Sequence, residues 1–160
     1  MKATKSRFSE SRKYILEFMN EYFVVCPRCE KCATVSVIEA GEMALFSPRR
    51  LTCAQCGYSA EWRGRSVSSR FTEVPLDWYF QRPFYYRADC CGHELWVFNR
   101  RHFDFLKEFV AAQIRSRTKS ALGWSNRNLA SRLPKWISAG KHRDKLLAAL
   151  KKIEQRMEAP

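Results

Sequence analysis

The chain has 160 residues, enough for one domain or for a small module with an extension. Its composition, 46% hydrophobic and 14% aromatic, excludes an intrinsically disordered protein. The sequence contains no run of about 18 apolar residues, so we predict no membrane span. No apolar signal-peptide core follows the charged residues 1–13, and we expect a cytoplasmic protein with reduced cysteines.

The net charge of +13 is concentrated at one end of the chain. Residues 99–160 carry fifteen basic and five acidic side chains, and therefore hold +10 of the total. This asymmetry favours an anionic partner for the C-terminal region, and we predict DNA or RNA. The alternative is a well-solvated helical surface. Nothing indicates a membrane partner or a small-molecule substrate.

Residues 1–21 predict a loose arm over 1–8 and a helix over 10–20, with the apolar side chains on one helical face. Short strands are then expected. Residues 22–25 and 49–52 lead into two cysteine pairs, and residues 34–38 and 57–62 follow those pairs. Residues 44–46 begin a further strand, which Pro48 interrupts.

Two C-x2-C pairs, Cys26/Cys29 and Cys53/Cys56, organise residues 22–64. Two cysteines three residues apart can reach one ion from a tight turn, at a zinc–sulfur distance of about 2.3 Å. We therefore predict one structural Zn²⁺ per chain, held by all four thiolates, with folding coupled to metal binding. The position after the second cysteine often needs φ > 0, which Gly57 fits and Glu30 does not.

Cys32 leaves open which cysteine completes the first pair. Together with Cys26 and Cys29 it also forms the opening of an iron–sulfur motif, but the next cysteine is Cys53 and the short motif is incomplete. A redox-active C-x2-C pair is typical of a βαβ pattern, whereas these pairs lie among short strands. We interpret Cys32 as a spare buried thiol or an alternative ligand.

Residues 65–117 predict an aromatic hairpin followed by an amphipathic helix. The hairpin is expected over 84–98 with Gly92 in its loop, and Asn99 is expected to cap a helix over 100–117. The aromatic side chains of residues 76–98 form either a stacking surface for nucleic acid or the core that joins the cysteine module to the helices. The neutral charge of residues 65–98 favours the core.

Residues 118–160 predict a basic helical C-terminal region. We expect a linker over 118–125, a short helix over 126–133, a turn over 134–137 and a final helix over 141–157. Pro134 fits a helix-turn-helix badly, and Trp136 packs in the core or stacks on a base. The residues that we predict to contact nucleic acid are Arg127, Arg132, Lys135, Trp136, Lys141, Arg143 and Lys145.

The layout of Cys26/Cys29 and Cys53/Cys56 resembles the transcription-factor-IIB-type zinc ribbon, over about a quarter of the chain. Residues 90–96 and 132–137 look similar to segments of bacterial zinc-ribbon proteins of uncharacterised function. The resemblance implies short antiparallel strands around one zinc ion. It implies no reaction, because such ribbons occur in transcription factors, polymerase subunits, ribosomal proteins and enzymes.

The sequence thus predicts an α+β protein with a zinc ribbon, an aromatic β-hairpin and C-terminal helices. Our first hypothesis is a zinc-stabilised, non-enzymatic nucleic-acid-binding protein. The alternative is a protein–protein adaptor that docks through residues 76–98 or the C-terminal helices. A third hypothesis is an enzyme that uses Cys90, Cys91 and His93, with His102 as a further candidate. Phosphate-loop, metalloprotease and nucleophile-elbow motifs are missing, and we predict no catalytic residue.

Overall fold

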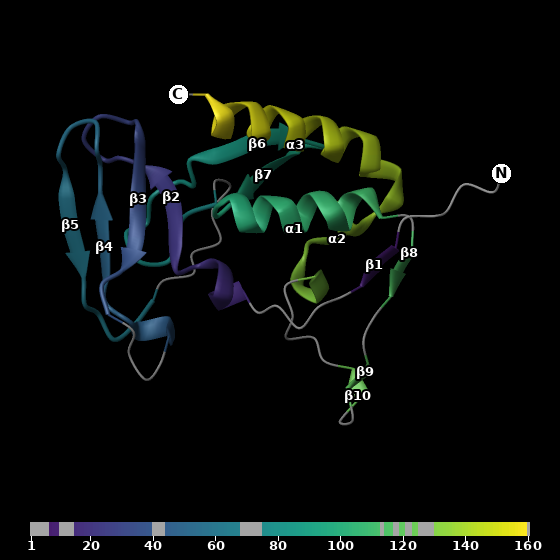
Figure 1. The fold of residues 1–160 in the computed structure, drawn as a ribbon, viewed down its shortest axis with the longest axis horizontal. Helices are drawn as coiled ribbons and strands as arrows, with labels where there is room; N and C mark the ends of the chain where they lie inside the picture. The colour runs from purple at the N-terminus through teal and green to yellow at the C-terminus, as the bar shows by residue number, and fades with distance from the viewer. Residues whose placement is uncertain are drawn as a thin grey trace.

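In the computed structural model of the protein, the described residues are 7–9, 15–39, 44–67, 75–112, 114–116, 119–120, 123–124 and 130–159. They form an α+β structure with antiparallel sheets and a C-terminal helix, as predicted. Figure 1 shows a four-stranded sheet at one side of the molecule and a hairpin with two long helices at the other. Within the described part of the chain, no helix is long and apolar enough to cross a membrane.

The four-stranded sheet has the order β2-β3-β4-β5, and all neighbouring strands are antiparallel. Its strands are β2 (Glu21–Val25), β3 (Cys32–Val37), β4 (Arg49–Thr52) and β5 (Ser59–Trp62). Val25 pairs with Cys32, and Thr52 pairs with both Thr34 and Ser59. The β2–β3 and β4–β5 turns therefore leave the sheet at the same end. These turns carry the two cysteine pairs.

The outer edge of β2 is covered by the segment that leads into the hairpin. Val25 N donates to the carbonyl of Pro83 at 2.9 Å, and Tyr85 N donates to the carbonyl of Phe23 at 3.0 Å. The hairpin consists of β6 (Tyr86–Cys90) and β7 (His93–Val97). Cys91 and Gly92 have φ of 56° and 76°, as a two-residue type I′ turn requires. The predicted hairpin with Gly92 in its loop is confirmed.

The aromatic side chains of the hairpin belong to the core. The rings of Phe84 and Trp96 are stacked at 4.2 Å, and Phe98 meets Trp96 edge-on at 4.9 Å. Phe84 also meets Tyr22 of β2, with ring centroids 6.0 Å apart. These contacts join the sheet to the helices, which is the role that the neutral charge of this segment favours.

Helix α1 (Arg100–Ala111) begins at its predicted cap. The side chain of Asn99 accepts a hydrogen bond from His102 N at 3.0 Å, and its Nδ2 donates to the carbonyls of Phe18 and Glu21 at 2.7 Å each. The cap therefore also anchors the N-terminal segment. Helix α3 (Arg143–Glu158) runs alongside α1 and the hairpin, as Figure 1 shows, and it matches the helix predicted over 141–157.

Helix α1 is shorter than the predicted helix over 100–117. The guanidinium of Arg143 donates to the carbonyls of Val110 and Ala112, at 3.1 and 3.0 Å. Residues Ile114–Ser116 then form β8, which pairs in parallel with β1 (Arg7–Ser9). A side chain from α3 and a strand from the N-terminal region thus provide the hydrogen bonds that further helical turns would have made.

Three other elements also differ from expectation. Arg7 and Phe8 belong to β1, so the predicted loose arm over 1–8 is wrong at these two residues. Of the helix predicted over 10–20, Ile15–Phe18 forms a 3-10 turn (η1), and residues 10–14 lie outside the described residues. The helix stops there because the carbonyls of Phe18 and Met19 accept hydrogen bonds from side chains. Residues Ala44–Phe46 form a 3-10 turn (η2) instead of a strand.

The C-terminal region is less helical than predicted before α3. The expected linker contains a small antiparallel pair, β9 (Lys119–Ser120) and β10 (Gly123–Trp124). Short turns follow at η3 (Ala130–Arg132), α2 (Lys135–Ser138) and η4 (Gly140–His142). Of the helix predicted over 126–133, residues 126–129 and thus its start lie outside the described residues.

A buried polar centre joins the sheet to the loop that precedes the hairpin. Asp77 is fully buried and accepts hydrogen bonds from the Tyr22 hydroxyl at 3.1 Å and from Arg82 N at 2.7 Å. Its Oδ1 also accepts from the backbone N–H groups of Tyr79 and Phe80, at 3.0 Å each. The buried guanidinium of Arg49 lies 4.1 Å from the centroid of the Tyr79 ring and donates to the Met19 carbonyl. This centre was not foreseen from the sequence.

Candidate metal centre

The two cysteine turns have the same backbone hydrogen bonds. In the first turn, Cys26 N donates to the Lys31 carbonyl at 2.8 Å, and Glu30 N donates to the Cys26 carbonyl at 3.1 Å. The second turn, residues 53–58, repeats both bonds at 2.9 Å. Each turn places its two cysteine side chains on the same side of the chain. Because the turns lie at one end of the sheet, the two pairs face each other.

The four sulfur atoms of these turns form one cluster. All the Sγ atoms of Cys26, Cys29, Cys53 and Cys56 lie within 4.8 Å of one another. The Cys26–Cys56 and Cys29–Cys53 sulfur distances are 3.7 and 3.6 Å. Four thiolates bound tetrahedrally at 2.3 Å from one ion would be about 3.8 Å apart. The four predicted residues therefore fit a metal ion, and Cys26 and Cys53 are buried.

The thiols of this cluster influence one another's ionisation. Burial raises the pKa of Cys26, but hydrogen bonds from backbone N–H groups and neighbouring thiols outweigh burial and lower that pKa to about 7. For Cys29, the backbone N–H of Lys31 lowers the pKa, but burial and the other three thiols raise it to about 12. One thiolate forms readily and discourages the next. A cation bound between the sulfur atoms would favour the thiolate form of its ligands.

The residue that follows each pair has a left-handed backbone. Gly57 has a φ of 72°, and Glu30 has a φ of 59° in the equivalent position. The turn geometry thus imposes a positive φ on Glu30 although its Cβ disfavours that conformation. From the sequence we expected that Glu30 would not fit a position with φ > 0. Glu30 adopts that conformation nevertheless, although a residue with a Cβ is less stable there than glycine.

We expect Glu30→Gly to raise the free energy of unfolding of the metal-loaded protein by about 0.5–1 kcal/mol, because glycine removes the left-handed strain. Gly57→Ala should lower it by about 1–2 kcal/mol. An added Cβ at Gly57 would meet no atom within 4 Å, so that loss would come from backbone conformation alone. Urea unfolding of the two variants measures both changes. A Glu30→Gly protein less stable than wild type would contradict the strain argument.

Cys32 is not part of the cluster. It begins β3, where it pairs with Val25, and burial raises the pKa of its thiol. The bond from Cys26 N to the Lys31 carbonyl closes the first turn before Cys32, so geometry separates this residue from the other four cysteines. The cluster therefore includes Cys29 and not Cys32, which answers the question that the sequence left open.

The Cys90, Cys91 and His93 group lies at the hairpin turn. The two sulfur atoms are 3.3 Å apart, and burial, followed by the neighbouring Cys91 thiol, raises the pKa of Cys90 to about 11. A nucleophilic cysteine needs the opposite shift. His93 stacks on Trp136, with ring centroids 4.7 Å apart. In the described ranges, the four-cysteine cluster is the one group of three or more metal-ligating side chains.

The residues predicted to contact nucleic acid fall into three groups. Lys135, Lys141 and Lys145 are exposed, as is Arg132, and Arg127 lies outside the described residues. Two members are engaged in packing, since Arg143 binds the end of α1 and Trp136 is half-buried against His93.

The chain matches no protein-family model, no curated protein and no solved structure, so its function is inferred from its own contacts and charges.

Proposed function

We propose that the cysteine centre holds one Zn²⁺ ion, that residues 22–64 are a zinc ribbon of the transcription-factor-IIB type, and that the protein binds DNA or RNA without catalysing a reaction. Four thiolates in tetrahedral positions favour zinc or iron. The single C-x2-C-x2-C run lacks the spacing of a short iron–sulfur motif. The ion closes both turns and so supports the sheet, which is a structural role. Elemental analysis of the purified protein distinguishes one zinc from iron.

A row of exposed cations on the C-terminal helix carries the nucleic-acid proposal. Lys141, Lys145, Lys152 and Arg156, here called the basic stripe, are spaced at i, i+4, i+11 and i+15. At 3.6 residues per turn this spacing puts them on one side of α3 and the turn before it, over a length of about 22 Å. Phosphate groups of a nucleic-acid backbone are recognised by such rows of Lys and Arg.

Two of the three acidic side chains of α3, Glu154 and Glu158, pair with residues of α1. Glu154 pairs with Arg100 and Lys107 of α1, at 3.2 and 3.1 Å. Among the described residues, the lysines of the basic stripe form no ion pair. The positive charge of the stripe is therefore not neutralised by the protein and is available to an anionic partner.

The basic stripe ends near the cysteine turns. The guanidinium of Arg156 lies 5.0 Å from the centroid of the half-buried Tyr85 ring and donates to the Arg87 carbonyl at 3.2 Å. Arg28 and Lys31 are exposed on the first cysteine turn. Figure 1 shows the C-terminal end of α3 at the same end of the molecule as the β2–β3 turn. In the proposed role, the zinc ribbon would add these two cations to the stripe, and Tyr85 would offer a ring for base stacking.

Adjacent lysines of α3 provide a matched test of this surface. Lys151 and Lys152 are both exposed but lie about 100° apart around the helix, and only Lys152 belongs to the basic stripe. We expect the double variant Lys145→Ala/Lys152→Ala to weaken binding to a short DNA duplex. For four phosphate contacts, the wild-type plot of log K against log salt should have a slope of about −3 to −4. The double variant should make this slope less negative by about 2. Lys151→Ala should change the slope little.

Fluorescence anisotropy over a range of salt concentrations measures these slopes, with single-stranded RNA as a parallel probe. No binding of either nucleic acid at low salt would contradict the proposed function. Equal losses in Lys151→Ala and in the double variant would contradict the assignment of the basic stripe, because the effect would then follow net charge and not position.

A further inference from the structure

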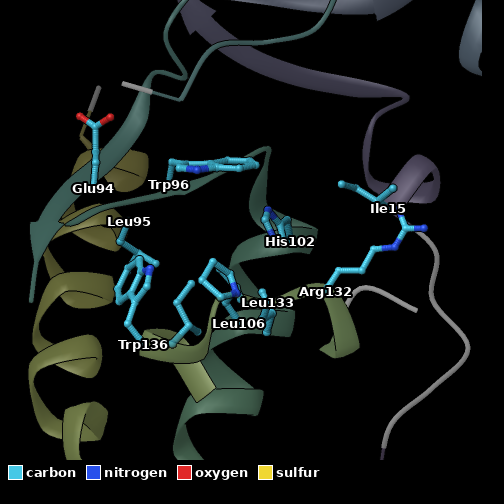
Figure 2. A pocket seen from close by; sticks show the side chains of 11 residues that line it. Ile15, Glu94, Leu95, Trp96, His102, Leu106, Arg132, Leu133 and Trp136 are labelled. Carbon is cyan, nitrogen blue, oxygen red and sulfur yellow. The ribbon is translucent and has the colours of Figure 1, made fainter. Parts of the chain in front are cut away.

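A pocket of about 140 Å³ lies between the hairpin, α1 and the segment around α2. Figure 2 shows Trp96 on one side, Trp136 and Leu133 on the other, and the ring of His102 between them. The other apolar lining residues are Ile15, Leu95, Leu106, Pro134 and Ile137. A dry apolar cavity of similar size, about 150 Å³, is known to hold benzene. The pocket is therefore large enough for a molecule with a single ring.

His102, one of the residues that line this pocket, has a buried ring nitrogen without a hydrogen-bond partner in the described part of the chain. The side chain is 3% exposed, and its Nδ1 accepts a hydrogen bond from Phe98 N at 3.1 Å. Burial lowers the pKa of His102 to about 3, so the ring is neutral near pH 7. A neutral imidazole that accepts at Nδ1 must carry its proton on Nε2. His102 Nε2 is buried and has no nitrogen or oxygen partner among the described residues.

We propose that this pocket binds a small, planar, uncharged and largely apolar molecule, about the size of one aromatic ring, whose hydrogen-bond acceptor pairs with the Nε2–H of His102. A buried donor without a partner costs free energy, and a ligand acceptor would remove that cost. The two tryptophans offer flat apolar surfaces to a planar ring. Such a site is independent of the metal centre and of the basic stripe.

The polar residues at the edge of the pocket favour an uncharged ligand. Glu94 lines the pocket, has a buried Oε2 without a partner in the described part of the chain, and lies 3.5 Å from Arg87 through Oε1. The exposed Arg132 lines the pocket as well. Figure 2 shows the ends of Glu94 and Arg132 directed away from the two tryptophans, so neither charge would be paired with an ion bound between them. Because burying an unpaired charge costs free energy, a neutral ring with one acceptor is the best match.

Acetophenone and α-methylstyrene test the proposal, because they differ only in C=O against C=CH₂. We expect acetophenone to bind the metal-loaded full chain at least about tenfold more tightly, since the hydrocarbon leaves the His102 donor unpaired. Titration by NMR measures both affinities. Acetophenone should also move the ¹⁵N shift of His102 Nε2 in a spectrum tuned to imidazole nitrogens, while α-methylstyrene should not move it in the same way.

Two leucine variants locate the binding. Leu133→Trp should fill the pocket and abolish acetophenone binding, and the Phe98–His102 hydrogen bond should remain. Leu147→Trp places the same change at a half-buried leucine of α3 outside the pocket lining, and it should bind as wild type does. Equal affinity for the two probes or an unchanged His102 shift would overturn the proposal. Binding that survives Leu133→Trp would overturn it too. If acetophenone does not bind at all, the pocket holds only water and the proposal is overturned.

Discussion

Replacing Cys53 with serine is expected to release the metal ion and to unfold the end of the sheet that carries the cysteine turns. Cys53 is buried, and its sulfur lies 3.6 Å from that of Cys29, on the other turn. Binding of a structural zinc ion contributes about 10–16 kcal/mol in zinc-finger peptides, so losing one of four ligands should be the largest single effect in this protein. Elemental analysis and urea unfolding measure the two consequences.

Cys32→Ser is the matched control for this variant. Cys32 is a half-buried cysteine at the start of β3, and its sulfur lies outside the four-sulfur cluster. It should keep one metal ion per chain and unfold near the wild-type midpoint. Amide hydrogen exchange shows which strands lose structure. In Cys53→Ser, protection should be lost first in β3, β4 and β5. If Cys53→Ser and Cys56→Ser both keep the ion and the wild-type midpoint, the assignment of the ligands is wrong.

Asp77→Ala is expected to lower the free energy of unfolding by about 3–5 kcal/mol, because each buried donor left without an acceptor costs about 1–3 kcal/mol. The variant would leave the Tyr22 hydroxyl and three backbone N–H groups without their acceptor. Burial, and then the Asp77 charge, raise the pKa of Tyr22 well above 10, so this hydroxyl stays a donor.

Two further substitutions separate the buried centre from a general loss of charge. Asp77→Asn keeps one acceptor oxygen and should cost less than Asp77→Ala. Asp89→Ala removes an exposed carboxylate of β6 and should change stability by no more than about 0.5 kcal/mol. Urea unfolding of metal-loaded protein gives all three values. A loss for Asp77→Ala as small as that for Asp89→Ala would show that the centre contributes little to stability.

Prediction from the sequence succeeded where the signal is local. The spacing within each cysteine pair indicates a tight turn, and the four predicted sulfur atoms do come together. Asn99 precedes an amphipathic run, which is the usual position of a cap, and it caps α1. The apolar stripe of α3 likewise follows from a period of 3.6 residues, and Leu146, Leu150 and Ile153 are buried.

The sequence by itself thus determined which four cysteines cluster at the candidate metal centre, the hairpin turn and the final helix, because neighbours in the chain carry those signals. The tertiary structure alone decided the roles of Arg143 and Asp77, whose partners Val110 and Tyr22 lie 33 and 55 residues away. It also placed His102 beside a pocket and Trp136 against His93. Packing between distant segments determines which polar groups are buried and which partners they find. The residue type of a basic or aromatic side chain does not reveal whether that side chain will face solvent or the core.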